Sequence, residues 1–260
     1  MSASPLVTVV TATTGDPRVM QAIESVAAQS HRNIQHLVVL DNPQAPTDIK
    51  MAIRQRSVDL IELPYPTGKD RFNGHRIYGA SAFLGRGDYF CFLDEDNWFD
   101  PDHVAALLDV TQRGFSWAFS FRKIVDGDGT FICDDDCESL GKWPTILSDQ
   151  DFHVDTGCYF LPRLIALQSS PIWYRRFRDP PNPDPDRALV EWLRKNTFNY
   201  DTSGLYSLNY RVGNTANSVH RDFFLAGNQR MLEKHQGKLP WRHRQAKPPA
   251  PRVSVTWQLA

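Results

Sequence analysis

A run of aromatic and apolar residues that ends in a cluster of acids, YFCFLDEDN at 89–97, constrains the fold of this chain most. The apolar part predicts a buried β-strand. The acids then lie at the carboxyl end of a sheet, where open α/β sheets bind their ligands. Asp94 and Asp96 can both turn toward one hard cation, such as Mg²⁺ or Mn²⁺ shared with a substrate diphosphate. A solvated acidic turn is the alternative, because Asp100-Pro101 has the pattern of a helix start.

The first sixty residues alternate between strand and helix patterns. β-branched and apolar runs at 6–12, 34–40 and 58–63 predict buried strands, and helices are expected at 19–29 and 47–56. This order predicts a parallel sheet with right-handed crossovers.

The rest of the chain continues the mixture of strands and helices. Strands are expected at 117–125, 130–133, 157–161 and 205–210, with a hairpin turn at 126–129. Helices are expected at 75–84, 101–112 and 163–168, from Pro185 onward, and at 219–235. Residues 134–155 show no regular pattern, and the proline-rich, basic residues from 237 predict an extended tail.

Composition narrows the class of protein. Apolar residues make up 41% of the chain, enough for a sizeable core, and the net charge of -1 argues against a general nucleic-acid or membrane-binding field. We find neither a signal peptide nor an apolar run long enough to span a bilayer, which predicts a soluble protein of a reducing compartment. Cys133 and Cys137 flank three aspartates, but they lack the second ligand pair of a typical metal site.

The order of these motifs resembles the family 2 glycosyltransferases of the GT-A fold, strongly over residues 5–110 and traceably to about 220. The resemblance is carried by residues 9–13, 22–29, 33–34, 37–42, Gly74, Arg76, Gly79, 87–89, 93–97, Pro101 and His103. It implies an α/β fold with a mostly parallel central sheet flanked by helices. It also implies a GT-A domain at 1–236, with a nucleotide-sugar-binding half (1–110) and an acceptor-side half (111–236), followed by a tail at 237–260.

The resemblance implies roles on the donor side of the site. The base would lie against Thr11, Ala12, Thr13 and Asp41, where the Asp41 carboxylate can accept an N–H from uracil or guanine. Arg76 would face the diphosphate. Asp94 would contact the ribose or a metal-bound water, with Glu95 beside it. Asp96 would bind Mn²⁺ or Mg²⁺ directly, with His220 as a further ligand. The competing interpretations are a turn residue for Asp41, a surface arginine for Arg76 and a structural histidine for His220.

The family also places an acceptor-activating carboxylate at the start of a later helix. Asp186 matches that position, but Pro185 replaces the glutamate that usually precedes it, so the general base is Asp186 or Asp184. The alternative is that both acids only favour the helix N-terminus electrostatically.

The expected activity is metal-dependent transfer of a sugar from a nucleoside diphosphate, UDP rather than GDP, to a hydroxyl of a glycan or another acceptor. Inversion is expected, with retention as the alternative outcome. A sugar-1-phosphate nucleotidyltransferase is the first alternative, although residues 11–17 contain one glycine and no lysine where that class needs a Gly-rich basic loop. A non-catalytic carbohydrate-binding protein on the same fold is the second. The expected location is the cytoplasm or the surface of a membrane.

Overall fold

The computed structural model describes residues 4–69, 72–174, 185–196, 199–213 and 219–242. A nine-stranded sheet runs in the order β3-β2-β1-β4-β8-β6-β9-β5, with β7 paired to β6. Its strands are β1 (Val7–Thr13), β2 (Ile34–Leu40), β3 (Asp59–Glu62), β4 (Tyr89–Asp94), β5 (Trp98–Phe99), β6 (Trp117–Val125), β7 (Phe131–Asp134), β8 (Tyr159–Pro162) and β9 (Tyr200–Arg211).

The first half of the sheet is parallel. β1 is buried along its whole length and lies between β2 and β4. The register sets Ala12 beside Asp94 of β4, and Thr13 beside Leu40, the last residue of β2. The carboxyl ends of these strands therefore meet at one edge, as the sequence pattern predicts.

The second half of the sheet is mixed, so the predicted mostly parallel sheet is correct only for the first half. β8 pairs antiparallel with β4 and β6, and β7 is antiparallel to β6, whereas β6 and β9 are parallel. A parallel pair needs a long crossover connection, usually a helix. The tight turn after β6 allows no such crossover, so β7 returns antiparallel to β6.

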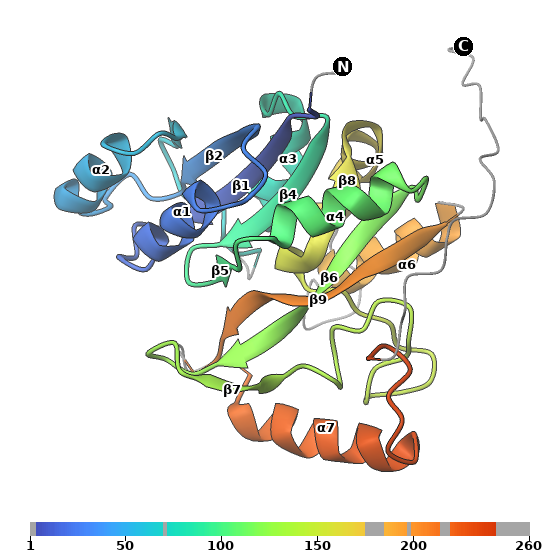
Figure 1. The fold of residues 1–260 in the computed structure, drawn as a ribbon. Helices are drawn as coiled ribbons and strands as arrows, with labels where there is room; N and C mark the ends of the chain where they lie inside the picture. The colour runs from blue at the N-terminus through green and yellow to red at the C-terminus, as the bar shows by residue number, and fades with distance from the viewer. Residues whose placement is uncertain (1–3, 70–71, 175–184, 197–198, 214–218, 243–260) are drawn as a thin grey trace.

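Helices cover both faces of the sheet. They are α1 (Val19–Ala27), α2 (Thr47–Arg54), α3 (His75–Leu84), α4 (His103–Gln112), α5 (Arg163–Ser169), α6 (Pro185–Asn196) and α7 (Arg221–Lys234). In Figure 1, α1 and α4 lie in front of the sheet and α3 and α5 behind it, while α7 lies beneath β7. The predicted α/β architecture is therefore confirmed, and none of the described helices is long and apolar enough to cross a bilayer.

The acidic segment 134–155, which has no periodic pattern, is fixed by ion pairs. Asp135 is fully buried against Arg122, and Asp136 accepts hydrogen bonds from Trp241 and Arg242. Both aspartates are thus compensated by cations or N–H donors of the chain itself. The bonds to Asp136 also tie residues 241–242 to the domain, so the tail expected from 237 begins with packed residues.

Trp241 tests this attachment. Its side chain is 1% exposed, and its indole N–H donates to Asp136 Oδ1 at 2.7 Å. We expect Trp241→Ala to lower the free energy of unfolding by about 3–5 kcal/mol, because it removes a large buried ring and leaves a cavity. Urea denaturation measures the change, with Leu232→Ala on the exposed side of α7 as the control. A loss no larger than that of the control would mean that residues beyond 237 do not belong to the folded unit.

Candidate active site

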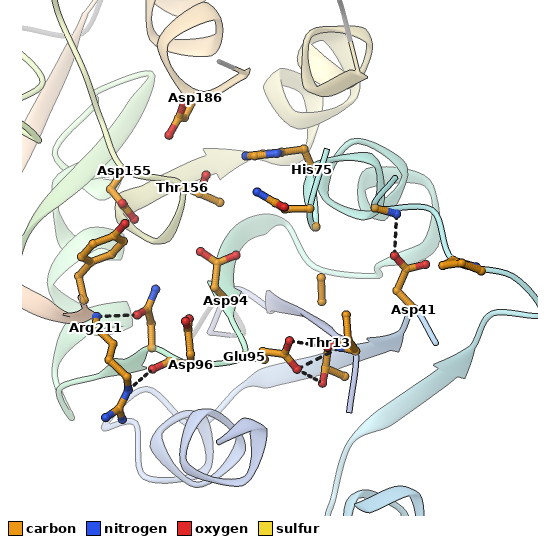
Figure 2. Close-up of a pocket in the computed structure, with 18 residues that line it drawn as sticks. Thr13, Asp41, His75, Asp94, Glu95, Asp96, Asp155, Thr156, Asp186 and Arg211 are labelled. Atoms are coloured by element: carbon orange, nitrogen blue, oxygen red, sulfur yellow. Dashed lines mark hydrogen bonds between the residues drawn. The ribbon is translucent and has the colours of Figure 1, made fainter. Parts of the chain in front are cut away.

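A cleft of about 590 Å³ opens at the carboxyl ends of β1, β2 and β4. Its walls are formed by Ala12, Thr13, Thr14, Asp41, Pro66, Gly68, Asn73, Gly74, His75, Asp94, Glu95, Asp96, Asn97, Asp155, Thr156, Asp186, Tyr210 and Arg211. Figure 2 shows Asp94 and Asp96 on one wall, Asp186 on the opposite wall and Asp41 at the far end from Asp155. The cleft is therefore long and rich in carboxylates.

Asp94 ends β4 and turns its carboxylate into the cleft, where the Tyr78 hydroxyl donates to Oδ1 at 2.5 Å. Burial, followed by the neighbouring charge of Asp96, raises the pKa of Asp94 to about 7. The carboxylates of Asp94 and Asp96 repel each other when both are ionised. A divalent cation bound by both would relieve that repulsion. The pair has the chemistry of a hard-cation site.

Glu95 lies between these two aspartates in the sequence, but it turns toward the loop that follows β1. Its carboxylate accepts from the hydroxyls of Thr13 and Thr14, at 2.5 and 2.9 Å, and from the backbone N–H groups of Thr14 and Asp16. We predicted that Glu95 binds the nucleotide sugar. The structure shows its carboxylate holding the β1–α1 loop against the end of β4, and because Glu95 also lines the cleft, its contact with the nucleotide sugar stays a prediction.

Arg211 fixes the acidic turn from the opposite side. Its guanidinium donates to the backbone oxygens of Asp96 and Gly127, at 3.0 and 2.8 Å, and to the side chain of Gln21. Its backbone N–H donates to Asn97 Oδ1 at 2.9 Å. Sequence reasoning missed this residue, because it lies more than a hundred positions from the turn and no local pattern connects the two.

Asp41 follows β2 and lies at the predicted base end of the cleft. Its two oxygens accept from the backbone N–H groups of Thr67 and Gly68, at 2.6 and 2.9 Å. Each carboxylate oxygen offers two acceptor positions, so Asp41 retains capacity for a ligand N–H. Ala12 and Thr13 line the same end, whereas the Thr11 hydroxyl is buried and bonds to His36 Nε2.

Arg76 does not line the cleft. Its guanidinium donates to the Thr67 carbonyl at 2.6 Å and lies 4.0 Å from the centre of the Phe72 ring. The structure thus places it behind the loop that carries Thr67, where it supports the Asp41 contacts, and we do not assign it to the diphosphate.

The wall opposite Asp94 carries Asp186 and Asp155. Asp186 lies in the first turn of α6, with its side chain 20% exposed and its Oδ2 3.9 Å from His153 Nε2. Asp155 Oδ1 accepts from the Gly157 N–H at 2.9 Å, and Oδ2 is ion-paired with Arg122. Asp184, the other candidate base, lies outside the described residues. Asp186 lines the cleft.

His220 is exposed at the N-terminal boundary of α7 and is not part of the cleft wall. Among the described residues, no three His, Cys, Asp or Glu side chains gather as a metal-binding group. Mg²⁺ and Mn²⁺ commonly use one or two carboxylates and complete their shell with phosphates and water. Asp94 and Asp96 therefore fit such an ion without a third protein ligand, and we leave His220 out of the set.

His75 was also missed from the sequence, where it reads as a helix residue. Figure 2 shows its ring pointing into the cleft below Asp186. Nδ1 lies 2.6 Å from the Phe72 carbonyl oxygen, which can only accept, so Nδ1 carries the proton. The ring also stacks on Trp173, which fixes its orientation.

A known protein family resembles this chain in sequence, and known structures resemble it in fold. The sequence profile described as Glycosyl transferase family 2 matches residues 8–161. Crystal structures of S. aureus TarS have a similar fold: the complex with UDP-GlcNAc has a TM-score of 0.59 at 13% identity, covering 84% of this chain and 60% of that chain. The complex of TarS with UDP has a TM-score of 0.57 at 12% identity, covering 88% and 71%. This chain thus spans less than two thirds of the first structure. No curated protein sequence matches.

The perturbed carboxyl of Asp94 predicts a pH-dependent stability. Its pKa of about 7 in the folded protein lies above the ordinary value of 3.8, so the folded state binds this proton more tightly than the unfolded chain. Ionisation of Asp94 therefore lowers stability as the pH rises from about 4 to about 7. In metal-free buffer, Asp94→Asn should raise the melting temperature at pH 8, and the gain should shrink toward pH 4.

Asp102→Asn, at an exposed position, is the control for loss of one negative charge. A melting temperature of Asp94→Asn at or below that of the wild type at pH 8 would contradict the raised pKa of this carboxyl group.

Proposed function

Because the chain belongs to glycosyl transferase family 2, we propose that it transfers a sugar from a nucleoside diphosphate to an acceptor hydroxyl. The observation that carries the proposal is the arrangement of carboxylates across one cleft. Asp94 and Asp96 end β4, and Asp186 faces them from the first turn of α6. One wall is suited to a metal-bound diphosphate and the other to deprotonation of an acceptor.

We propose that Asp96 and Asp94 hold Mn²⁺ or Mg²⁺ together with the donor diphosphate. When bound, the ion would supply the positive charge that a departing diphosphate needs. The protein's contribution is to hold both carboxylates in place, through Tyr78 on Asp94 and through Arg211 on the backbone of Asp96. No described arginine or lysine other than Arg211 lines the cleft, which supports a role for a cation.

We propose UDP as the nucleotide. Asp41 lies at the end of the cleft distant from Asp155 and retains acceptor capacity for the imide N–H of uracil. Structures of TarS, with a similar fold, contain UDP and UDP-GlcNAc. GDP, whose base also presents N–H groups, is the alternative that a binding assay separates.

We propose an inverting displacement with Asp186 as general base. The acceptor hydroxyl would give its proton to the Asp186 carboxylate as its oxygen forms the bond to the anomeric carbon. The bond from that carbon to the diphosphate breaks on the opposite side, toward Asp94 and Asp96. Asp186 is 20% exposed and lies across the cleft from these residues, which supports this direction of attack.

The loop after β1 argues against the nucleotidyltransferase alternative. Such an enzyme needs this loop to receive phosphates with its backbone N–H groups. Here the N–H groups of Thr14 and Asp16 already donate to the Glu95 carboxylate, which would repel a phosphate.

Release of nucleoside diphosphate from a panel of UDP- and GDP-sugars, with glycan acceptors and Mn²⁺, tests the proposed activity. We expect turnover with at least one UDP-sugar. Absence of both donor binding and turnover across the panel would refute the proposal.

Asp96→Ala tests the metal site. We expect it to abolish transfer and to remove the Mn²⁺ dependence of UDP binding, because one of two carboxylate ligands is lost. His220→Ala is the control and should leave the Mn²⁺ dependence as in the wild type. Calorimetric titration with UDP, with and without Mn²⁺, measures this dependence in both variants. Normal turnover by Asp96→Ala would show that the metal role is wrong.

Asp186→Asn tests the general base, since it keeps the size of the side chain and removes the proton acceptor. We expect transfer to fall by ~10²–10⁴-fold, the usual contribution of such a base, while UDP affinity stays unchanged. Asp184→Asn should cost far less, because on this proposal its carboxylate takes no proton in the reaction. Steady-state rates with saturating donor decide between the two, and the reverse order would move the base to Asp184.

A further inference from the structure

A buried arginine lies behind the acceptor wall of the cleft. Arg122, on β6, is 2% exposed, and its guanidinium contacts three carboxylates. Nε donates to Asp135 Oδ2 at 2.8 Å, and the other two nitrogens are ion-paired with Glu138 and Asp155. The Tyr210 ring lies 4.3 Å from the guanidinium carbon. Two of these partners, Asp155 and Tyr210, line the cleft.

Glu138 extends this contact to α6. One of its oxygens binds Arg122, and the other accepts from Arg187 Nη2 at 2.9 Å. Arg187 also pairs with Asp151, at 2.5 Å, and its backbone N–H donates to Asp186 Oδ1 at 3.0 Å. A continuous chain of charged contacts thus runs from the core of the sheet to the residue beside Asp186.

This network joins parts of the chain that no regular element connects. Asp155 precedes β8, Tyr210 belongs to β9 and Asp186 lies in the first turn of α6. Removing one partner of a buried ion pair leaves an uncompensated charge, so the geometry of such a pair is held tightly. The planar guanidinium fork adds direction to the attraction, because it accepts carboxylates only along its N–H bonds. The network can therefore set where three cleft residues lie relative to one another.

The donor side of the cleft is anchored separately. Asp94 is held by Tyr78, Glu95 by the β1–α1 loop, and the backbone of Asp96 by Arg211. None of the hydrogen bonds found for these described residues runs through Arg122, Glu138 or Arg187. The side-chain contacts that hold the two walls thus differ, although Tyr210 and Arg211 are neighbours on β9 and β8 pairs with β4.

We propose that Arg122 is a positioning residue for the acceptor side of the site. It fixes Asp155 and Tyr210 directly, and it fixes the first turn of α6, with Asp186, through Glu138 and Arg187. This role rests on the proposed function of Asp186 as general base. It implies that weakening the network impairs transfer to the acceptor and leaves the binding of donor nucleotide intact.

Arg187→Gln is the main variant, because Arg187 is 20% exposed and its loss leaves the buried Arg122 in place. We expect kcat/KM for the acceptor to fall by about 10²-fold, the cost of displacing a catalytic group by about 1 Å. The Kd for UDP with Mn²⁺ should stay within about twofold of the wild type, since the donor wall is untouched. Arg194→Gln, on the same helix and stacked on Phe152, is the matched control and should leave both values unchanged.

Glu138→Gln and the double variant with Arg187→Gln test whether the two residues act as one chain. We expect the double variant to be no slower than the more impaired single variant, because either change breaks the same path. Fully additive losses, or equal losses of UDP affinity and transfer, would overturn the proposal, since a merely structural role would impair both walls together.

Hydrogen exchange keeps the proposal testable even if no transfer is detected. In Arg187→Gln, we expect faster backbone exchange at residues 151–156 and 185–190 and unchanged exchange in β1 and β4. Unchanged exchange at both acceptor segments would refute the positioning role. Failure of the wild type to bind any nucleotide sugar would refute the proposed function, without altering this result.

Discussion

The parallel pairing of β1 with both β2 and β4 is the constraint on which the site depends. It brings residues 12–14, Asp41 and Asp94 to one edge of the sheet, although the first and last of these are 82 positions apart in the chain. Because β1 is completely buried, its register is set by the packing of apolar side chains on both faces. If β4 were shifted by one residue against β1, its acidic end would face away from the cleft. The chemistry of the site therefore depends on the packing of the sheet core.

Concentrating carboxylates at this edge has an electrostatic cost that the protein meets in two different ways. Carboxylates that serve the framework are paired within the chain: Glu95 with the β1–α1 loop, and Asp135 with Arg122. Asp94 is instead left in an environment that disfavours its charge, as its raised pKa shows. Perturbed carboxyls of this kind are typical of functional sites, where a ligand supplies the missing compensation. Asp94, which no arginine or lysine of the described chain pairs with, is therefore the carboxylate best placed to gain from a bound cation.

Local patterns predicted most of the framework. Strands at 34–40 and 117–125 and the helix at 75–84 have the expected boundaries, because strong hydrophobic periodicity dictates them. The clustering of Asp41, Asp94 and Asp96 was also predictable, since strand ends of a parallel sheet converge. The positions of Arg211, Arg122 and His75 were not, because each acts through contacts across the fold that leave no pattern in the sequence. Contacts across the fold also decide the surroundings of Arg76 and Glu95. Their residue types suit a ligand, but their side chains bind loops of the protein itself.

The two carboxylates at the end of β4 are proposed to bind a nucleoside diphosphate through a divalent cation. Isothermal titration of the wild-type protein with UDP, in Mn²⁺ and then in EDTA, tests it most directly. We expect binding in Mn²⁺ that weakens by at least about tenfold in EDTA, because an acidic cleft repels a bare diphosphate. Equal affinity in both conditions, or no binding of UDP in Mn²⁺, would contradict it.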